Sequence, residues 1–342
     1  MKYRGAIVGL GNVAVAGHLP AWQQNPDFTL CAVVDPVEER LALARHLLPG
    51  IAYYRRIEEL FARERLDCID ICAPPLLHDV LLLAACQYNV HILCEKSLTL
   101  SPATWQGLHS YTEEQPRVVC TVHNWQYAPL FQTLKKLLAA NTVGPPGYLE
   151  LITLRTAPAG RVLTGENSWR LDPQVAGGGI LIDHGWHVFY LVPWLLACKP
   201  RTIAVQLKRR RLPADAVEDT ATGTIAGVDA RARFHLTWAG ERRSNERLLR
   251  GSKGTLRFDA ASVVIEKSGE EPRKQHFTEP LTASSYHPEW FAAVLEEFQR
   301  EIEDPSARGQ NLQAAALCLA LTERAYESHR CGGIALPLNN LD

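Results

Sequence analysis

The alternation of apolar and polar residues predicts a repeat of strands and helices up to residue 122. Short apolar runs cover residues 3–8, 30–34, 68–72, 91–94 and 118–122, and stretches with helical periodicity cover residues 16–22, 37–48, 78–88 and 103–114. Strands that alternate with helices at this spacing imply right-handed crossovers and a parallel sheet covered by helices on both faces.

The pattern changes after residue 122, where strands follow one another with few helices between them. A helical stretch at 130–139 leads through a Gly-Pro-Pro-Gly turn at 144–147 to strand-like runs at 148–156, 202–207, 221–225, 232–238, 248–250, 255–258 and 262–265. Glycine-bearing turns between such runs favour a largely antiparallel sheet. Helical stretches at 179–196, 288–302 and 312–327 are expected to cover one face. An apolar, uncovered opposite face is expected to form an oligomer interface, giving a homodimer or homotetramer through this sheet.

Length and composition support two folded domains. A chain of 342 residues is long for one core, and 46% hydrophobic residues without a low-complexity linker exclude a largely disordered chain. We therefore predict an α/β protein. Residues 1–122 form a doubly wound parallel sheet, and residues 123–342 form an α+β domain with an open, mostly antiparallel sheet.

A glycine turn joins the first strand to the first helix and indicates a bound dinucleotide. It reads Gly9-Leu10-Gly11-Asn12-Val13-Ala14. Gly9 permits the tight turn, Gly11 lets the backbone approach a pyrophosphate, and Asn12 and Val13 open a helix whose N–H groups face the phosphates. Alanine is an accepted third residue of this motif. The alternative is a tight structural turn in an unrelated α/β domain.

The acidic residue after the second strand bears on the choice of cofactor. Asp35 lies 24 residues beyond Gly11. A carboxylate at this position accepts hydrogen bonds from a ribose 2′-hydroxyl and repels a 2′-phosphate. The first domain is therefore predicted to be a Rossmann domain that binds NAD, with NADP disfavoured.

Charge and cysteine usage exclude several other classes of protein. The net charge of −1 gives no electrostatic reason to expect nucleic acid or an anionic membrane as a partner, and the basic run at 208–211 is typical of a solvated strand end. The nine cysteines include no Cys-x-x-Cys pair, and several lie in apolar runs, which favours a reducing cytoplasm. The sequence shows no signal segment and no apolar span long enough for a bilayer.

Two segments of the first domain follow predicted parallel strands, at the sheet edge where ligands bind. Glu95 and Lys96 follow the strand at 91–94, and the lysine is placed to bond a substrate hydroxyl; alternatively, the two form a solvated ion pair. Pro74 and Pro75 set a rigid turn that would shape the adenosine side of a cleft. His78 is expected to orient that turn rather than to catalyse.

The glycine triplet at 177–179 precedes an apolar helix that bears ionisable groups. Asp183 and His187 are four residues apart and would project from one face of a helix. Buried ionisable groups are costly unless they are paired, so this pattern suggests chemistry or a satisfied Asp–His pair. A metal site with His184 as a further ligand is disfavoured, because the two histidines lack zincin spacing and no third histidine is placed. We therefore expect no metal.

The stretch from 156 to 173 combines glycine with side chains suited to a substrate loop. Substrate contacts are assigned to four residues: Arg161, Trp169, Arg170 and His184. Asn167 is a further candidate in the same stretch. The alternative for the tryptophan is simple burial in a core, the usual place of large aromatic side chains.

Set in order, these motifs resemble the glucose–fructose oxidoreductase, inositol dehydrogenase and rhizopine-catabolism family, written Gfo/Idh/MocA. The likeness covers nearly the whole chain and rests on residues 9–14 with Asp35, 74–78, 94–96, 169–170, 177–187 and the Glu-Asp-Thr at 218–220. It implies a Rossmann domain followed by an α/β domain with an open sheet. It also implies NAD or NADP as cofactor and a sugar, inositol or sugar derivative as substrate.

The resemblance also implies roles for individual residues. Lys96, Asp183 and His187 match the family's catalytic trio: His187 would take the hydroxyl proton, Asp183 would orient the imidazole, and Lys96 would hold the hydroxyl or itself accept the proton. Asn124 matches a position beside the nicotinamide. Two departures concern substrate geometry: Ser97 replaces a proline, and Gln126 stands where an arginine is common.

Three functions are compatible with this interpretation. The leading one is an NAD-dependent dehydrogenase or reductase acting on a CH–OH carbon of a cyclic polyol, sugar or sugar derivative. The second is net non-redox chemistry in which bound NAD is reduced and reoxidised, as in glycosidase-like members of the family. The third is a dinucleotide-binding regulator that transforms nothing. The presence of all three catalytic residue types argues against the third.

Overall fold

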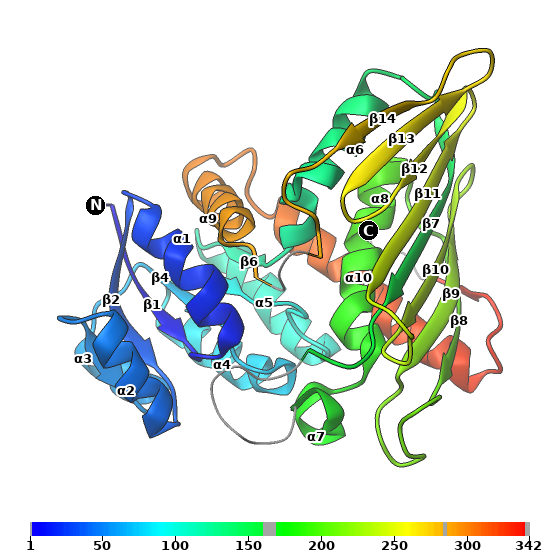
Figure 1. Ribbon diagram of the computed structural model, residues 1–342. Coiled ribbons are helices and arrows are strands. Elements are labelled where there is room, and N and C mark those ends of the chain that lie inside the picture. The colour runs from blue at the N-terminus through cyan, green and yellow to red at the C-terminus, as the bar shows by residue number, and fades with distance from the viewer. Residues whose placement is uncertain (1, 160–168, 283–285, 339–342) are drawn as a thin grey trace. The chain divides into compact units, whose positions relative to one another are not determined.

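The computed structural model describes residues 2–159, 169–282 and 286–338 (Figure 1). Contacts divide them into two units. The first contains residues 2–124 and 286–316, and the second contains 125–159, 169–282 and 317–338. The N-terminal segment therefore ends close to the expected boundary. Residues 286–316, however, belong to the first unit, whereas the sequence pattern assigns them to the second domain.

A six-stranded parallel sheet forms the centre of the first unit. Its strands are β1 (Tyr3–Val8), β2 (Phe28–Val34), β3 (Ala52–Tyr54), β4 (Cys68–Ile71), β5 (His91–Cys94) and β6 (Val119–Thr121). Their order is β3-β2-β1-β4-β5-β6, and every pair is parallel. This is the Rossmann order, which reverses direction between β1 and β4. The predicted doubly wound sheet is confirmed. The sequence pattern missed β3, because three half-buried residues show no clear periodicity.

Helices cover this sheet, and one of them comes from the far end of the chain. They are η1 (Ala14–His18), α1 (Leu19–Gln24), α2 (Glu38–Leu47), α3 (Ile57–Arg63), α4 (Pro75–Gln87), α5 (Pro102–Glu114) and α9 (Pro288–Glu303). The expectation that α9 covers the second sheet is wrong. The Phe291 ring lies 4.3 Å from the His18 ring, and Gln299 donates to Asp27. The apolar face of an amphipathic helix needs burial but does not specify which sheet provides it.

A nine-stranded sheet forms the second unit. Its strands are β7 (Pro146–Leu154), β8 (Thr202–Lys208), β9 (Thr220–Ala226), β10 (Arg231–Thr237), β11 (Ser244–Gly251), β12 (Gly254–Phe258), β13 (Ser262–Lys267), β14 (Arg273–His276) and β15 (Leu336–Pro337). Their order is β14-β13-β12-β11-β7-β10-β9-β8-β15, and only β7 with β10 is parallel. This confirms the open, mostly antiparallel sheet. The basic run at 208–211 lies at the end of β8, as expected.

The second unit's helical segments are α6 (Pro129–Ala139), η3 (Trp169–Leu171), α7 (Pro173–Ala176), η4 (Leu181–Gly185), α8 (Trp186–Leu196) and part of α10 (Gln310–Arg330), while η2 (Asn124–Tyr127) crosses the boundary between the units. Helix α8 is almost entirely buried and lies against β7 (Figure 1). Among the described helices, none combines the length and apolar character that a bilayer span requires.

The outward positions of the large sheet are polar, in contrast to the expected apolar face. Arg233 lies 3.9 Å from Glu150, and the guanidinium groups of Arg231 and Arg250 each lie 5.6 Å from the centre of the Tyr148 ring. Strand β10 alternates exposed charged residues with buried Ala232, Phe234 and Leu236, the pattern of a sheet with one solvated face. These positions therefore do not supply the apolar surface from which an oligomer interface was expected. The homo-oligomer stays a prediction.

Candidate active site

The glycine turn has the geometry that a dinucleotide requires. Gly9 has φ +94°, and a Cβ there would lie 2.9 Å from the carbonyl group of Cys72, so only glycine fits. A Cβ on Gly11 would meet nothing within 4 Å, which leaves open space above the turn. The amide of Val15 bonds the Gly11 carbonyl at 3.1 Å, so a helix begins directly after the glycines. Open backbone followed by a helix N-terminus suits a pyrophosphate.

Asp35 braces this turn from the end of β2. Its side chain is buried; Oδ2 accepts the Leu10 N–H at 2.7 Å, and Oδ1 accepts the Val37 N–H at 2.9 Å. Nη1 of Arg40 lies 3.4 Å from Oδ2. Asp35 therefore has a structural bond to the turn in addition to its predicted contact with a ribose. Arg40 was not singled out by the sequence, although an arginine here is the residue type that accommodates a 2′-phosphate.

The turn after β4 is held by the histidine predicted to orient it. Pro75 opens α4, and His78 is fully buried one turn into that helix. Nε2 of His78 lies 2.9 Å from the Ala73 carbonyl oxygen, and Nδ1 lies 2.7 Å from the Ser97 carbonyl oxygen. Burial lowers the pKa of this imidazole, and the two carbonyl contacts oppose that effect. His78 thus links the proline turn to the segment that follows Lys96.

Glu95 and Lys96 emerge from the carboxyl end of β5. Oε2 of Glu95 accepts the Lys96 N–H at 2.9 Å, and Oε1 lies 3.2 Å from Nε2 of His18 on η1. The carboxylate is buried, and the lysine side chain is partly exposed. Ser97, which replaces the family's proline, follows through a cis peptide bond. In place of the solvated carboxylate of the alternative interpretation, Glu95 is buried and tied to the backbone and to a histidine that the sequence did not single out.

Asn124 ends the N-terminal part of the first unit. Its Oδ1 is buried and has no hydrogen-bond donor within the described segments. A buried carbonyl oxygen without a donor is rare in folded proteins and suits a site that a ligand amide completes.

In the second unit, the glycine triplet packs a helix against a strand. Gly177 has φ +75° and ends α7. A Cβ on Gly179 would lie 1.9 Å from the carbonyl oxygen of Glu218, just before β9. The Glu218 side chain accepts the Leu181 N–H at 3.1 Å and the Tyr326 hydroxyl at 3.0 Å, while burial raises its pKa. Close packing therefore explains the glycine at 179, and the left-handed backbone explains the glycine at 177.

The structure brings four of the predicted site residues together in the second unit. Nε of Arg170 lies 3.5 Å from Oδ1 of Asp183, and Nδ1 of His184 lies 3.2 Å from its Oδ2. The Arg170 guanidinium also lies 4.4 Å from the centre of the Trp169 ring. Arg161 and Asn167, the other residues predicted for this region, lie outside the described segments.

His187 is held by partners that the sequence did not reveal. Its ring stacks on Trp125 with the centroids 4.3 Å apart, and its Nδ1 lies 2.8 Å from the Tyr190 hydroxyl. That hydroxyl oxygen also accepts the Trp125 N–H at 3.1 Å. Tyr190 is one helical turn beyond His187, so the i, i+3 spacing was available in the sequence as a signal. If Nδ1–H donates to Tyr190, the neutral ring carries its lone pair on Nε2.

Two buried arginines close to these residues were also missed. Arg155 follows β7 and bonds the carbonyls of Leu154 and Ser244 and the side chain of Asn245. Arg247 on β11 stands over the rings of Trp125 and Phe131, and its terminal nitrogens are buried without a hydrogen-bond acceptor in the described part of the chain. Burial lowers the pKa of Arg155 to about 10 and that of Arg247 to about 9.

The Rossmann order, the glycine turn and the second α+β unit define a two-part dinucleotide-binding protein. Residues 3–123 match the family described as oxidoreductase family, NAD-binding Rossmann fold, and residues 131–257 match the GFO/IDH/MocA C-terminal domain. The chain belongs to the Gfo/Idh/MocA family, and its first unit is an NAD-binding Rossmann domain. The predicted resemblance is confirmed.

Individual relatives are distant. The chain is 25% identical over 190 residues to myo-inositol 2-dehydrogenase of Thermotoga maritima; the match covers 56% of this chain and 54% of the enzyme, so the chain spans about half of that relative's length. It is 24% identical to the putative UDP-kanosamine synthase oxidoreductase subunit of Amycolatopsis mediterranei over 96% of each chain. The structure of levoglucosan dehydrogenase in complex with NADH covers 100% of both chains with a TM-score of 0.85 at 15% identity, which shows a shared fold.

Proposed function

We propose that the protein is an NAD-dependent oxidoreductase that transfers hydride between nicotinamide and a CH–OH carbon of a sugar, an inositol or a sugar derivative. The observation that carries this proposal is the setting of His187. Its Nδ1 is bonded to the Tyr190 hydroxyl, and its ring is stacked on Trp125, so the imidazole has one orientation. A fixed neutral imidazole of this tautomer has its basic nitrogen at Nε2, which is suited to take the proton of a substrate hydroxyl.

The other predicted residues complete this chemistry. Bound NAD supplies the hydride acceptor. Lys96 would hold the substrate hydroxyl and stabilise the negative charge that develops on its oxygen. Asp183, which is paired with Arg170 and His184, would keep the surrounding charges balanced when the imidazole gains a proton. The Asn124 side-chain oxygen, for which the described residues supply no donor, would accept a hydrogen bond from a carboxamide.

Relatives guide the choice of substrates to assay. The names of the two curated relatives, a myo-inositol dehydrogenase and an oxidoreductase subunit for a nucleotide sugar, both point to polyhydroxylated rings. Trp169, with Arg170 over its face, offers an apolar surface and a hydrogen-bond donor to such a ring. We therefore propose a cyclic, oxygen-rich small molecule as the substrate.

A substrate panel tests the proposal directly. Purified protein is mixed with NAD and a set of inositols, sugars and sugar acids, and reduced nicotinamide is followed by absorbance. His187→Asn and Lys96→Met should each lower kcat by at least about 10²-fold, because each removes a group that acts in the transition state, while the Kd for NAD changes by less than about 3-fold. A control variant, His109→Asn, changes an exposed histidine on α5 and should keep full activity. Full turnover in either of the first two variants would contradict the assignment.

The alternative functions give different results in the same assay. If bound NAD is recycled within each turnover, no net reduction is seen, NAD copurifies with the protein, and product forms without added cofactor. A regulator binds NAD but converts no member of the panel. His187→Asn and Lys96→Met then show the same absence of turnover as the wild type.

A further inference from the structure

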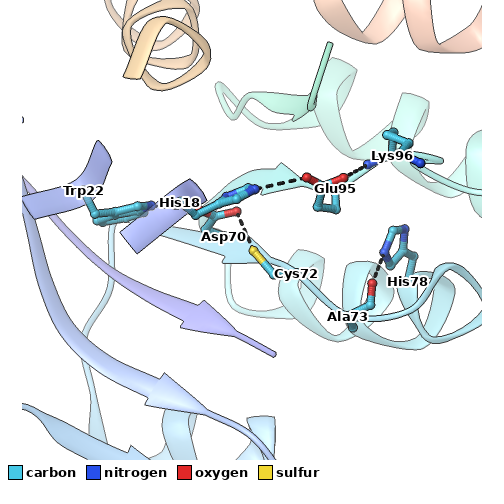
Figure 2. A network of polar contacts seen from close by, with 8 residues as sticks. All are labelled: His18, Trp22, Asp70, Cys72, Ala73, His78, Glu95 and Lys96. Atoms are coloured by element: carbon cyan, nitrogen blue, oxygen red, sulfur yellow. Dashed lines mark hydrogen bonds and ion pairs between the residues drawn. The ribbon is translucent and has the colours of Figure 1, made fainter. Parts of the chain in front are cut away.

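A network of buried polar contacts leads to the main chain of Lys96, and the proposed chemistry does not use this network. It joins three parts of the Rossmann unit: His18 at the end of η1, Asp70 in β4, and Glu95 after β5 (Figure 2). Nδ1 of His18 lies 2.7 Å from Oδ2 of Asp70, and Nε2 lies 3.2 Å from Oε1 of Glu95. Both ring nitrogens therefore face carboxylate oxygens, which can only accept hydrogen bonds.

This arrangement favours the charged form of the imidazole. Burial by itself lowers the pKa of His18, but the Asp70 carboxylate beside it raises that pKa well above its usual value. Burial likewise opposes ionisation of Glu95, yet the hydrogen bond from His18 lowers the pKa of that carboxyl group. The three side chains thus form a carboxylate, imidazolium, carboxylate chain in which each charge has an opposite neighbour.

Neighbouring side chains bury this network away from water. The side chains of His18 and Asp70 are at most 2% exposed. The indole N–H of Trp22 donates to Oδ2 of Asp70 at 2.8 Å, and the Phe291 ring of α9 lies 4.3 Å from the His18 ring. A Cβ on Gly17 would lie 2.5 Å from that phenylalanine, so α9 packs closely over the network. In such a setting a charge without a partner is expensive, so the contacts are held firmly.

A metal ion does not account for the cluster, although His18, Asp70 and Cys72 offer ligand atoms within 4.8 Å of one another. Two ligands of a tetrahedral Zn²⁺, with bonds of about 2.0–2.2 Å, lie about 3.4 Å apart. The 2.7 Å between Nδ1 and Oδ2 is instead a hydrogen-bond length, and the same oxygen already accepts the Trp22 N–H.

The network ends on the backbone of Lys96. Oε2 of Glu95, the oxygen that does not face His18, accepts the Lys96 N–H at 2.9 Å (Figure 2). A carboxylate bonded through both oxygens cannot rotate. We propose that His18 is a positioning residue for Lys96: held as an imidazolium between Asp70 and Glu95, it fixes the carboxylate that anchors the Lys96 main chain. The catalytic consequence rests on the proposed function of Lys96.

The first test measures the anchor without any substrate. In His18→Gln, the Glu95 carboxylate loses its charged partner, and the Lys96 amide hydrogen should exchange with solvent at least about 10-fold faster than in the wild type. The matched control is His91→Asn, which changes another buried histidine at the opposite end of β5 and should leave that exchange rate unchanged. Equal Lys96 exchange in His18→Gln and the wild type would overturn the proposal.

The second test separates positioning from general stability. In His18→Gln, kcat should fall about 10- to 100-fold while the KM for NAD stays within about 3-fold, because a displaced lysine weakens the chemical step more than cofactor binding. Adding Glu95→Gln should lower kcat little further, since both residues act through one bond. If the fold-losses in kcat of the two single variants multiplied in the double variant, the proposal would be overturned. If Lys96→Met keeps full turnover, the proposed function fails. The hydrogen-exchange result still decides whether His18 fixes the Lys96 main chain.

A measurement on the wild type covers the case in which His18→Gln does not fold. In a ¹⁵N-histidine NMR spectrum at about pH 8, exposed histidines have lost their second proton, but His18 should retain protons on both ring nitrogens. The resonance is assigned by its absence in a folded His18 variant or by its contact with the Phe291 ring. Absence of any doubly protonated histidine at this pH would overturn the charged network.

Discussion

The two ends of the parallel sheet hold a buried histidine in opposite charge states. At the carboxyl end, His18 faces two carboxylates, and the nearby Asp70 raises its pKa well above the usual value despite burial. At the amino end, His91 faces two donors, the Val118 N–H at 3.1 Å and Nη1 of Arg117 at 3.2 Å. Burial, with help from Arg117, lowers the pKa of His91 to about 4. Burial thus keeps His91 neutral, whereas the acidic partner of His18 outweighs burial and favours the charged form at the carboxyl end of the sheet.

The largest effect is expected from removing the acid that keeps His18 charged. Asp70→Asn leaves a buried imidazolium with one carboxylate, so the free energy of unfolding should fall by about 3–5 kcal/mol. The matched control is Asp67→Asn, just before the same strand, where the carboxylate accepts the Arg4 N–H at 2.8 Å. It should cost at most about 1 kcal/mol. Denaturant titration measures both, and equal losses would remove the contrast between the two ends.

A pH series examines the other side of the comparison. His91 is neutral when folded down to about pH 4, whereas the unfolded chain takes up a proton near pH 6.5, so the unfolded state binds more protons between these values. The wild type should therefore lose up to about 3 kcal/mol of unfolding free energy, relative to His91→Asn, as the pH falls from about 6.5 to 4. Parallel pH curves for the two proteins would show that His91 is not held neutral.

The smallest effect is expected at Arg247, whose buried terminal nitrogens have no hydrogen-bond acceptor among the described residues. Arg247→Met replaces a guanidinium that stands over two aromatic rings, and the free energy of unfolding should change by no more than about 1 kcal/mol in either direction. Arg155→Met is the matched control. It leaves three acceptors without their donor and should cost about 2 kcal/mol. A loss of unfolding free energy above about 3 kcal/mol in Arg247→Met would mean that the buried charge of Arg247 is balanced by a partner in the folded protein.

Short sequence patterns could predict only those parts of the candidate site whose residues lie close together along the sequence. The glycine turn at 9–14 follows a strand and opens a helix, so its role could be deduced from a few consecutive positions. The i, i+4 spacing of Asp183 and His187 was equally visible. Their partners were harder to find. Tyr190 lay within reach of the same spacing rule, but Trp125, which stacks on His187, and Arg247, which lies over Trp125, come from distant segments.

His18 shows why the remaining part could not be predicted. In the sequence it is a single histidine near the start of a short predicted helix, with Asp70 and Glu95 more than fifty positions away. Its partners become neighbours only because β1 pairs with β4 and β4 with β5. Strand order is a long-range property, and the residue pattern of a buried parallel strand is nearly the same for each strand.

The sequence by itself determined the alternation of strands and helices, the Rossmann turn and the family, because these depend on residue types at short, regular spacings. Only the tertiary structure decided that α9 returns to the first unit, that the outer face of the large sheet is polar, and that His18 lies between two acids. The reason is physical: an apolar face or a buried charge specifies that it needs a partner, and the packing of the whole chain selects which one.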